Sequence, residues 1–330
     1  TFSIVVPFFN NQFQVKKCIK SIIKNFKINK NKFEIILVDD SSSKIHYNQI
    51  RQFIGKNKNY RIRLIRNKKN CGPAQSRNIG AIEAKFKYIF FLDSDTTLHK
   101  DISKIILKNL KKNDILVGHY HYKPSNNTIA GNFKAIFNYC NFSYKGVVNF
   151  ETFNSACAVI KKKLFLDLGG FNKNIKWGMD YENEEFGRRI IKKHKIILDP
   201  TLTVMHEFPN LIKMFKLYFI RMIPYVSVIL DDRKLENIGP GNSSTILSIF
   251  FSIMISINFV IYAINREYFY FIMLISFLFC FLINNLKFIL MSIRIKPSQI
   301  FFFILIKFML AHILFFALNI GIIKYILKKK

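Results

Sequence analysis

Short apolar runs alternate with helix-like stretches over the first hundred residues of the chain. The apolar runs have the composition of buried strands and cover residues 2–7, 33–38, 61–65 and 88–92. Helical periodicity fills the intervals at residues 12–25, 44–56 and 74–85. Strands that alternate with helices predict a mostly parallel sheet with right-handed crossovers and helices on its faces. The expected fold class is α/β and Rossmann-like, although the G-x-G-x-x-G of the dehydrogenases does not follow the first strand.

The pattern is less regular between residues 101 and 206. We expect strands and helical segments at 101–110, 115–122, 156–160, 163–168, 195–198 and 203–206. Residues 126–149 are aromatic and polar, and an irregular segment is expected there. His119 and His121 share one face of the 115–122 strand. Because no third ligand is nearby, we expect an edge-strand pair there rather than a metal site.

The composition changes near Asn210, where long apolar segments begin. Residues 211–230 carry basic side chains and Pro224, which favours one or two amphipathic helices on a membrane surface. A core-facing helix of the soluble domain has the same periodicity. Because about 20 apolar residues cross a bilayer, we expect two or three transmembrane helices from the segments 246–264, 268–291 and 300–327. The predicted organisation is a soluble domain, an interfacial segment and a membrane region, at 1–208, 209–243 and 244–330.

The charge of the chain narrows the choice of ligands. Lys and Arg number 51 against 20 Asp and Glu, which gives a net charge of +31 and favours anionic lipids or phosphorylated ligands. No nucleic-acid-binding module accompanies this charge, so nucleic acid is not an expected partner. The 5 cysteines have neither metal-ligand nor redox spacing. The residues that follow Thr1 show no signal-peptide pattern.

Two carboxylates follow the apolar run at 88–92. Asp93 and Asp95 are two residues apart, so in an extended segment they point the same way and can converge on one cation. Ligands of open α/β sheets bind beyond the carboxyl ends of strands. Paired carboxylate oxygens suit Mg²⁺ or Mn²⁺ shared with a phosphate. Asp and Ser are also common in solvated turns, and the tripeptide by itself is compatible with either interpretation.

A second acidic segment lies between Trp177 and Arg189. Its carboxylates stand at the start of a predicted helix that ends near Lys193, where they complement the helix dipole. Clustered carboxylates also raise one another's pKa, which a general base can use. The segment therefore has either a structural or a catalytic interpretation.

Taken in order, these motifs resemble the family 2 glycosyltransferases of the GT-A fold. The resemblance covers residues 1–206 and is followed by the membrane region. The motifs that carry it are Val6-Pro7-Phe8-Phe9-Asn10, Val38-Asp39-Asp40-Ser41-Ser42, residues 70–80, Leu92-Asp93-Ser94-Asp95, Gly169-Gly170-Phe171 and the acidic segment 177–189.

The resemblance implies roles for residues on the donor side. Asp39 is expected to meet the base of a nucleotide sugar, with Pro7 and Phe9 beside it. Arg77 matches the position at which the family approaches the donor's sugar and diphosphate. Asp93 and Asp95 match the D-x-D pair that binds Mg²⁺ or Mn²⁺. Asp93 and Ser94 are also expected to contact the donor. His206 matches a histidine often found near that metal.

The resemblance is weaker at the position of the catalytic base. The family commonly has Glu-Asp there with the Asp as base, whereas this chain has Glu182-Asn183, and Asn cannot accept a proton. We expect Glu182 to be the base, with Asp180, Glu184 and Glu185 as alternatives.

The resemblance and the apolar segments together imply a membrane-bound, metal-dependent, inverting glycosyltransferase. Its donor would be a nucleotide sugar, expected to be UDP-linked, and its acceptor a lipid-linked molecule such as a polyprenyl phosphate, or a glycan. We expect a multi-pass protein of the cell membrane with a cytoplasmic catalytic domain, and a homo-oligomer is compatible with the sequence. The alternatives are a membrane-tethered module that binds nucleotide sugars without catalysis, and a polysaccharide synthase, although the synthases' Gln-x-x-Arg-Trp block is absent.

Overall fold

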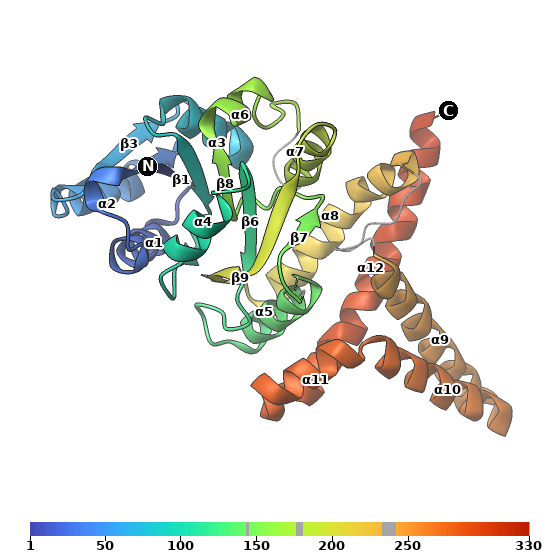
Figure 1. Ribbon diagram of the computed structural model, residues 1–330. Coiled ribbons are helices and arrows are strands. Elements are labelled where there is room, and N and C mark those ends of the chain that lie inside the picture. Colours follow the sequence, from blue (N-terminus) through green and yellow to red (C-terminus); the bar gives the residue numbers. More distant parts are fainter. Residues whose placement is uncertain (143–144, 176–180, 233–241, 330) are drawn as a thin grey trace. The chain divides into compact units, whose positions relative to one another are not determined.

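Figure 1 shows the protein as a computed structural model, which describes residues 1–142, 145–175, 181–232 and 242–329. The chain divides into two compact units. The first contains Thr1–His121 and Ser143–Glu207, and the second contains Tyr122–Phe142 and Phe208–Lys330. The segment 122–142 therefore groups with the C-terminal helices, although it interrupts the first unit in sequence.

The N-terminal half of the first unit is a parallel sheet in the order β3-β2-β1-β4. The strands are β1 (Phe2–Phe8), β2 (Phe33–Asp39), β3 (Ile62–Arg66) and β4 (Tyr88–Leu92). The connecting helices are α1 (Gln12–Asn25), α2 (Lys44–Gly55) and α3 (Gly72–Glu83). Strands β1 and β2 are buried along their whole length, because α1 and α2 cover one face of the sheet and α3 the other (Figure 1).

Strand β1 continues one residue past Pro7, where the sequence predicted its end. Strand β4 pairs with β1 only as far as Val5, so the missing N–H of Pro7 removes no bond to β4. On its other side β1 stays paired with β2 up to Phe8, opposite Asp39.

The C-terminal half of the sheet makes it mixed rather than uniformly parallel. Strand β8 (Cys157–Lys161) runs antiparallel between β4 and β6 (Ile115–Tyr120), and β9 (Ile196–His206) is parallel to β6. The short strands β5 (Thr96–Thr97) and β7 (Val148–Phe150) both pair antiparallel with β9. The remaining helices of this unit are α4 (Ser103–Asn109), α6 (Lys162–Asp167) and α7 (Glu182–Ile191).

Several expectations for this half were wrong. The predicted strands 195–198 and 203–206 form one strand, β9, which passes Pro200 where its register with β6 shifts. The segment 126–149 is not irregular, because it contains helix α5 (Ile129–Phe142) and β7. His119 is not on an edge strand: β6 lies between β8 and β9, and the His119 ring is buried with its Nε2 3.0 Å from the Pro200 carbonyl oxygen.

A cluster of phenylalanine rings on the α3 face of the sheet anchors α7. Phe91 of β4 contacts Phe153, Phe165 and Phe171 at centroid distances of 5.1 to 6.1 Å. Phe186 of α7 lies 5.0 Å from both Phe153 and Phe171. Aromatic pairs at these distances stabilise beyond the area they bury, so the start of α7 is held close to the end of β4.

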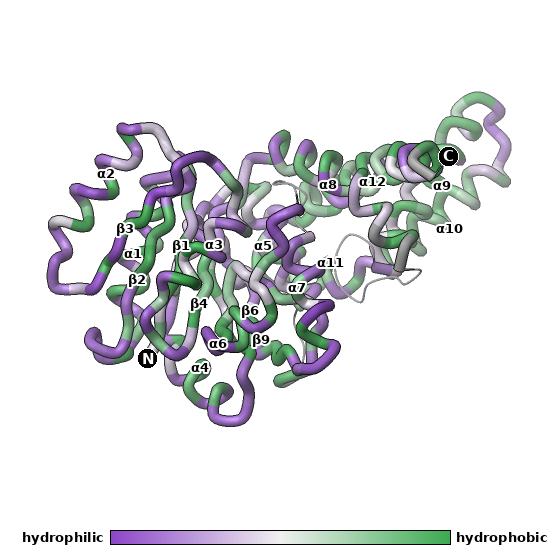
Figure 2. The backbone as a smooth tube through the Cα atoms, turned by 90° about the horizontal axis from the view of Figure 1, so that it is seen from above, coloured by the Kyte–Doolittle hydropathy of each residue, from purple (hydrophilic) through white to green (hydrophobic). Residues whose placement is uncertain are grey.

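The second unit is helical. It contains α5, α8 (Leu211–Asp232), α9 (Ser243–Asn265), α10 (Tyr268–Asn284), α11 (Leu286–Ile295) and α12 (Ile300–Lys329). Among the described residues, the helix Ser243–Asn265 and the segment Pro297–Leu327 are long and apolar enough to cross a membrane, and Figure 2 shows their hydrophobic character. Helices α10 and α11 meet at a bend of 67° and are a candidate span only when the two are taken together. The expected two or three candidate spans are therefore present by length and composition.

The segment predicted to be one or two amphipathic helices is the single helix α8, which continues through Pro224. Its Met214, Met222 and Tyr225 are buried in the core of the second unit, which also contains residues of α12. One face of α8 is therefore packed against other helices, and its position at a membrane surface stays a prediction.

The close approach of α3 to the sheet gives a stability test at Gly80. A Cβ at this position would lie 2.4 Å from Val5 Cγ1 and 3.1 Å from Val38 Cγ2, both on strands that cannot withdraw. We expect Gly80→Ala to lower the free energy of unfolding by about 1–3 kcal/mol through overpacking. The measurement is the urea midpoint of the detergent-solubilised protein, followed by circular dichroism.

Gly55→Ala at the end of α2 is the matched control, because a Cβ there meets nothing within 4 Å. It should leave the midpoint unchanged or raise it, since Ala favours the helix over Gly by up to about 1 kcal/mol. Equal midpoints for the two variants would contradict the packing described here.

Candidate active site

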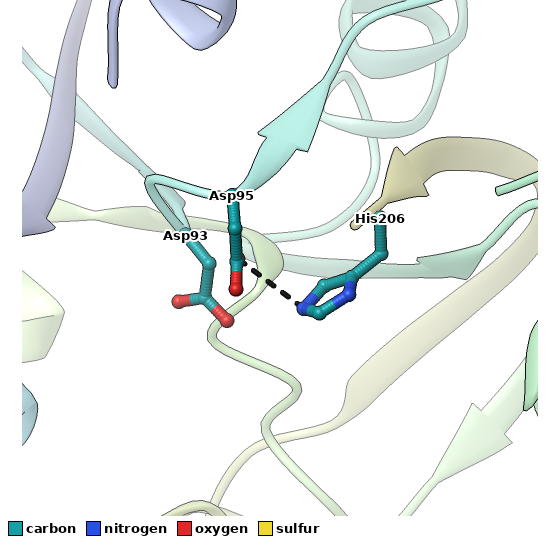
Figure 3. Close-up of side chains that lie close together, drawn as sticks. All are labelled: Asp93, Asp95 and His206. Carbon is teal, nitrogen blue, oxygen red and sulfur yellow. Dashed lines mark ion pairs between the residues drawn. The ribbon is translucent and has the colours of Figure 1, made fainter. Parts of the chain in front are cut away.

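The loop between β4 and β5 places Asp93 and Asp95 beside His206. Strand β5 pairs Thr96 with His206, which brings the end of β9 to the loop. Single ligand atoms of Asp93, Asp95 and His206 all lie within 4.8 Å of one another, and His206 Nε2 is 3.2 Å from Asp95 Oδ1 (Figure 3). Two carboxylates and an imidazole in this arrangement suit a divalent cation.

The Asp95 carboxyl is held in its charged form by its neighbours. Burial by itself would raise its pKa, but the imidazole of His206 and the more distant Arg77 guanidinium hold the pKa of Asp95 below its ordinary value. The expected pairing of Asp93 with Asp95 and the expected proximity of His206 are both present in the structure.

Arg77 links this cluster to the acidic segment. Its side chain is buried, with Nη2 2.6 Å from Asp93 Oδ1 and Nη1 3.4 Å from Glu182 Oε1. The guanidinium carbon lies 5.7 Å from the centre of the Phe171 ring. Burial opposes its charge, but Asp93 and Glu182 hold the pKa of Arg77 above its ordinary value. Its remaining donor, Nε, makes no hydrogen bond to any residue that the structure describes.

The structure separates the candidate bases from one another. Glu182 stands in the first turn of α7, almost buried and facing Arg77. Glu185 instead pairs with Arg189 of the same helix at 2.6 Å, and Arg189 donates to the Gly170 carbonyl. Glu184 lies in the same first turn, and Asp180 lies outside the described residues. Glu182 is connected to the Asp93 cluster through Arg77.

Asn183, the departure from the family pattern, has a structural role here. Its side-chain oxygen accepts a hydrogen bond from the Ser155 N–H at 3.3 Å, and its carbonyl accepts one from the Phe153 N–H at 3.3 Å. These bonds attach the start of α7 to the segment before β8.

Asp39 lies at the end of β2 and is fully buried. It accepts a hydrogen bond from the Ser42 N–H at 3.0 Å, and Arg66 Nε approaches its Oδ2 at 3.3 Å. That Oδ2 atom accepts no hydrogen bond from the described residues. Of the two residues expected beside Asp39, Pro7 is buried in β1, whereas Phe9 is 40% exposed in the next loop.

Ser94 is tied to the loop after β1 rather than being open to solvent. Its hydroxyl accepts a hydrogen bond from Asn11 Nδ2 at 2.7 Å, and the residue is buried. This bond holds the loop containing Asp93 and Asp95 against the start of α1.

Three positioning residues were missed by sequence reasoning. Asp40 accepts hydrogen bonds from the N–H groups of Cys71 and Gly72 at 2.9 and 2.8 Å, which fixes the start of the helix that carries Arg77. Asn78 exchanges two bonds with the backbone of Phe171, at 2.8 and 2.9 Å. Arg66 ends β3 beside Asp39, and its place at the carboxyl end of a strand was the signal that could have identified it.

Replacement of Arg77 tests its role as the central cation. Arg77→Met leaves Asp93 and Glu182 without their buried counter-charge, so we expect a loss of about 3 kcal/mol in unfolding free energy. The unfolding free energy of Arg77→Lys should lie between those of the wild type and Arg77→Met, because one ammonium cannot reach both carboxylates as the planar guanidinium does. The readout is again the urea midpoint, and Arg51→Met, at an exposed position of α2, is the control. A midpoint for Arg77→Met equal to that of the control would contradict the bridging role.

Comparison with known proteins places this site in a family. Residues 3–169 match the family described as Glycosyl transferase family 2. The chain is 30% identical over 172 residues to the poly(ribitol-phosphate) beta-N-acetylglucosaminyltransferase TarP of Staphylococcus aureus, a match that covers 50% of each chain. Matches to the first three curated relatives cover only 19% to 50% of those proteins' length.

Two solved structures share the fold at low sequence identity. One is the mannosyltransferase PcManGT from Pyrobaculum calidifontis in complex with GDP-Man and Mn²⁺, with a TM-score of 0.54, 13% identity and coverage of 73% of this chain and 66% of that one. The other is S. aureus TarS 1–349 in complex with UDP-GlcNAc, with a TM-score of 0.50, 16% identity and coverage of 93% and 90%. At these identities the likeness concerns the fold, which is that of the GT-A glycosyltransferases. Since the family match extends over half of the sequence, the chain belongs to glycosyltransferase family 2.

Proposed function

We propose that this protein is a membrane-bound inverting glycosyltransferase. It would move a sugar from a UDP-linked donor to a lipid-linked or glycan acceptor in the synthesis of a cell-envelope glycan or glycolipid. The observation that carries the proposal is the arrangement around Arg77, which joins the Asp93–Asp95–His206 cluster to Glu182. A metal-binding set and a carboxylate base side by side are what glycosyl transfer from a nucleotide diphosphate needs.

The donor side rests on two polar atoms without hydrogen bonds in the described residues. Asp39 Oδ2 is buried at the end of β2 and can accept a hydrogen bond from a nucleotide base, while Arg77 Nε can donate one to a phosphate oxygen. A relative named as an N-acetylglucosaminyltransferase and a neighbour solved with UDP-GlcNAc support UDP as the nucleotide.

Asp93, Asp95 and His206 would hold Mg²⁺ or Mn²⁺, since their donor atoms lie close enough to share one ion. Two neighbours of the same fold are described with Mn²⁺. When bound, the ion offsets negative charge that develops on the leaving diphosphate. The chain's own contribution is to hold the two carboxylates in place, through Arg77 on Asp93 and through His206 on Asp95.

Glu182 would accept the proton of the acceptor hydroxyl as the oxygen attacks the anomeric carbon. Direct displacement by that oxygen inverts the carbon. Asn183 cannot replace Glu182, because it cannot take up a proton and its amide oxygen is bonded to Ser155. Asp180, Glu184 and Glu185 remain the alternatives, although Glu185 is paired with Arg189.

The candidate spans support a membrane-bound acceptor. We place the catalytic unit on the cytoplasmic side of a cell membrane that the protein crosses more than once, in keeping with its net charge of +31. A lipid-linked acceptor would then be presented at the surface where the catalytic unit works.

A donor panel tests the transferase reaction. The detergent-purified protein is offered UDP-, GDP- and dTDP-sugars with Mn²⁺ or Mg²⁺ and a polyprenyl phosphate, and release of the nucleotide is measured. We expect turnover of one UDP-sugar that stops on chelation of the metal and returns when Mn²⁺ or Mg²⁺ is restored. Asp95→Ala should abolish turnover, because it removes a ligand from the cluster. Turnover that survives both the chelator and Asp95→Ala would overturn the metal assignment.

Glu182→Gln separates a catalytic role from simple donor binding. The amide keeps the size and the oxygen that faces Arg77 but cannot take up a proton, so kcat should fall by about 10² to 10⁴ while the Kd for donor changes little. Glu185→Gln is the matched control on the same helix and should retain most of kcat. Wild-type protein that binds donor with metal but never turns it over, with any acceptor, would favour a non-catalytic binding module.

A further inference from the structure

Three lysines of the second unit gather around one face of helix α5. They are Lys134 on α5 itself, Lys287 at the start of α11 and Lys307 on α12, and we call them the lysine cluster. The three helices pack against one another within this unit. None of the lysines takes part in the site described above.

Two of the ammonium groups contact neighbouring residues of α5. Lys287 Nζ donates to the Cys140 carbonyl at 2.6 Å, and Lys307 Nζ lies 4.0 Å from the centre of the Phe137 ring. Lys307 Nζ is also 5.7 Å from the ring of Phe288, the residue that follows Lys287. Phe137 and Cys140 are three positions apart on α5, so the two contacts lie within about one turn of that helix.

Lys134 completes the group and lies near the same Phe137 ring. Its ammonium lies 5.6 Å from the centre of that ring and 4.2 Å from the ring of Tyr218 on α8. It also contacts the Tyr218 hydroxyl. The cluster is therefore lined by aromatic rings and backbone carbonyls.

The cluster is not balanced by carboxylates of its own helices. Helices α5, α11 and α12 contain no Asp or Glu. In the part of the chain that the structure describes, neither Lys287 nor Lys307 forms an ion pair. Lys307 is only 7% exposed. A buried ammonium without a counter-charge is unfavourable, and an anion that joins it offsets that cost.

The position of Lys307 along α12 indicates where that anion comes from. The 30 residues of α12 make a helix about 45 Å long, which exceeds a hydrocarbon core of about 30 Å. Lys307 follows the first residue of α12, Ile300, by seven positions, or about 10 Å. Lys287 is the second residue of α11, directly after the 67° bend from α10, and α11 packs against α12. The start of α12 can therefore lie at the level of lipid phosphates.

We propose that Lys287 and Lys307, with Lys134 beside them, form a binding site for the phosphate group of a membrane lipid. The ammonium groups supply the charge, and the surrounding phenylalanine rings contact the adjoining acyl or prenyl chain. The inference rests on the membrane attachment proposed above but not on the transfer reaction. Lipid binding can therefore be measured without any donor.

The test is the binding of a fluorescent phosphatidylglycerol to the full-length protein in neutral detergent. We expect Lys287→Met and Lys307→Met each to weaken binding about fivefold, the effect of one basic residue near a lipid surface, and the double variant to weaken it further. Lys324→Met, at an exposed position on the same helix, is the matched control and should bind as wild type does. Methionine preserves the apolar stem, so Lys307→Met should unfold at or above the wild-type temperature. Lys287→Met loses its hydrogen bond to the Cys140 carbonyl and should unfold somewhat below it.

Competition separates the sources of phosphate. Polyprenyl phosphate and unlabelled phosphatidylglycerol should displace the probe, and dioleoylglycerol, which lacks the phosphate, should not. Displacement by inorganic pyrophosphate as readily as by phosphatidylglycerol would overturn the assignment to a lipid. Equal affinity of Lys307→Met and Lys324→Met would show that Lys307 only packs on its aromatic neighbours, and would overturn the site. Neither result bears on donor turnover, so failure here and failure of the proposed function can be told apart.

Discussion

The buried guanidinium of Arg77 is the interaction on which the catalytic unit depends. It lies between Asp93, which follows β4, and Glu182, which begins α7, and these two carboxylates are 89 positions apart in the printed sequence. A buried charge is tolerated only with its counter-charges in place, so the pair of contacts fixes both elements at once. The Nε atom of Arg77 donates no hydrogen bond to the residues that the structure describes. In the proposed function, this side chain would serve both the fold and donor binding.

The second constraint is the mixed sheet. In a uniformly parallel sheet, no strand pairing would bring the end of β9 to the loop after β4. The antiparallel pairing of Thr96 and Thr97 with the end of β9 brings His206 opposite Thr96, next to Asp95. The single long strand β9 makes this possible, because it passes Pro200 with a shift in register rather than ending there.

Side chains that bond to backbone groups hold the elements of the site in place. Asp40 binds two N–H groups before α3, and Asn78 holds the backbone of Phe171 beside the Gly169–Gly170 turn. Both glycines of that turn have positive φ, 77° and 64°, a conformation that glycine adopts without strain. In the helical unit, the polar feature is the lysine cluster, in which Lys287 and Lys307 contact α5 and Lys134 belongs to it. Helices α5, α11 and α12 contain no Asp or Glu that could balance the charges of this cluster.

Much of the fold could be predicted because its signals are local. The alternation of apolar strands and amphipathic helices up to Leu92, the placement of Asp39 and Asp93 at strand ends and the long apolar helices all follow from periodicity. The helix over 129–142 was missed, because its apolar and polar residues face other helices of the second unit rather than solvent on one side. The sequence by itself determined which residue types stand at the strand ends. Only the tertiary structure decided that Arg77 bridges Asp93 and Glu182, that Glu185 turns to Arg189 and that Lys287 and Lys307 both contact α5, since each is a contact between segments or a choice among neighbouring rotamers that no local pattern encodes.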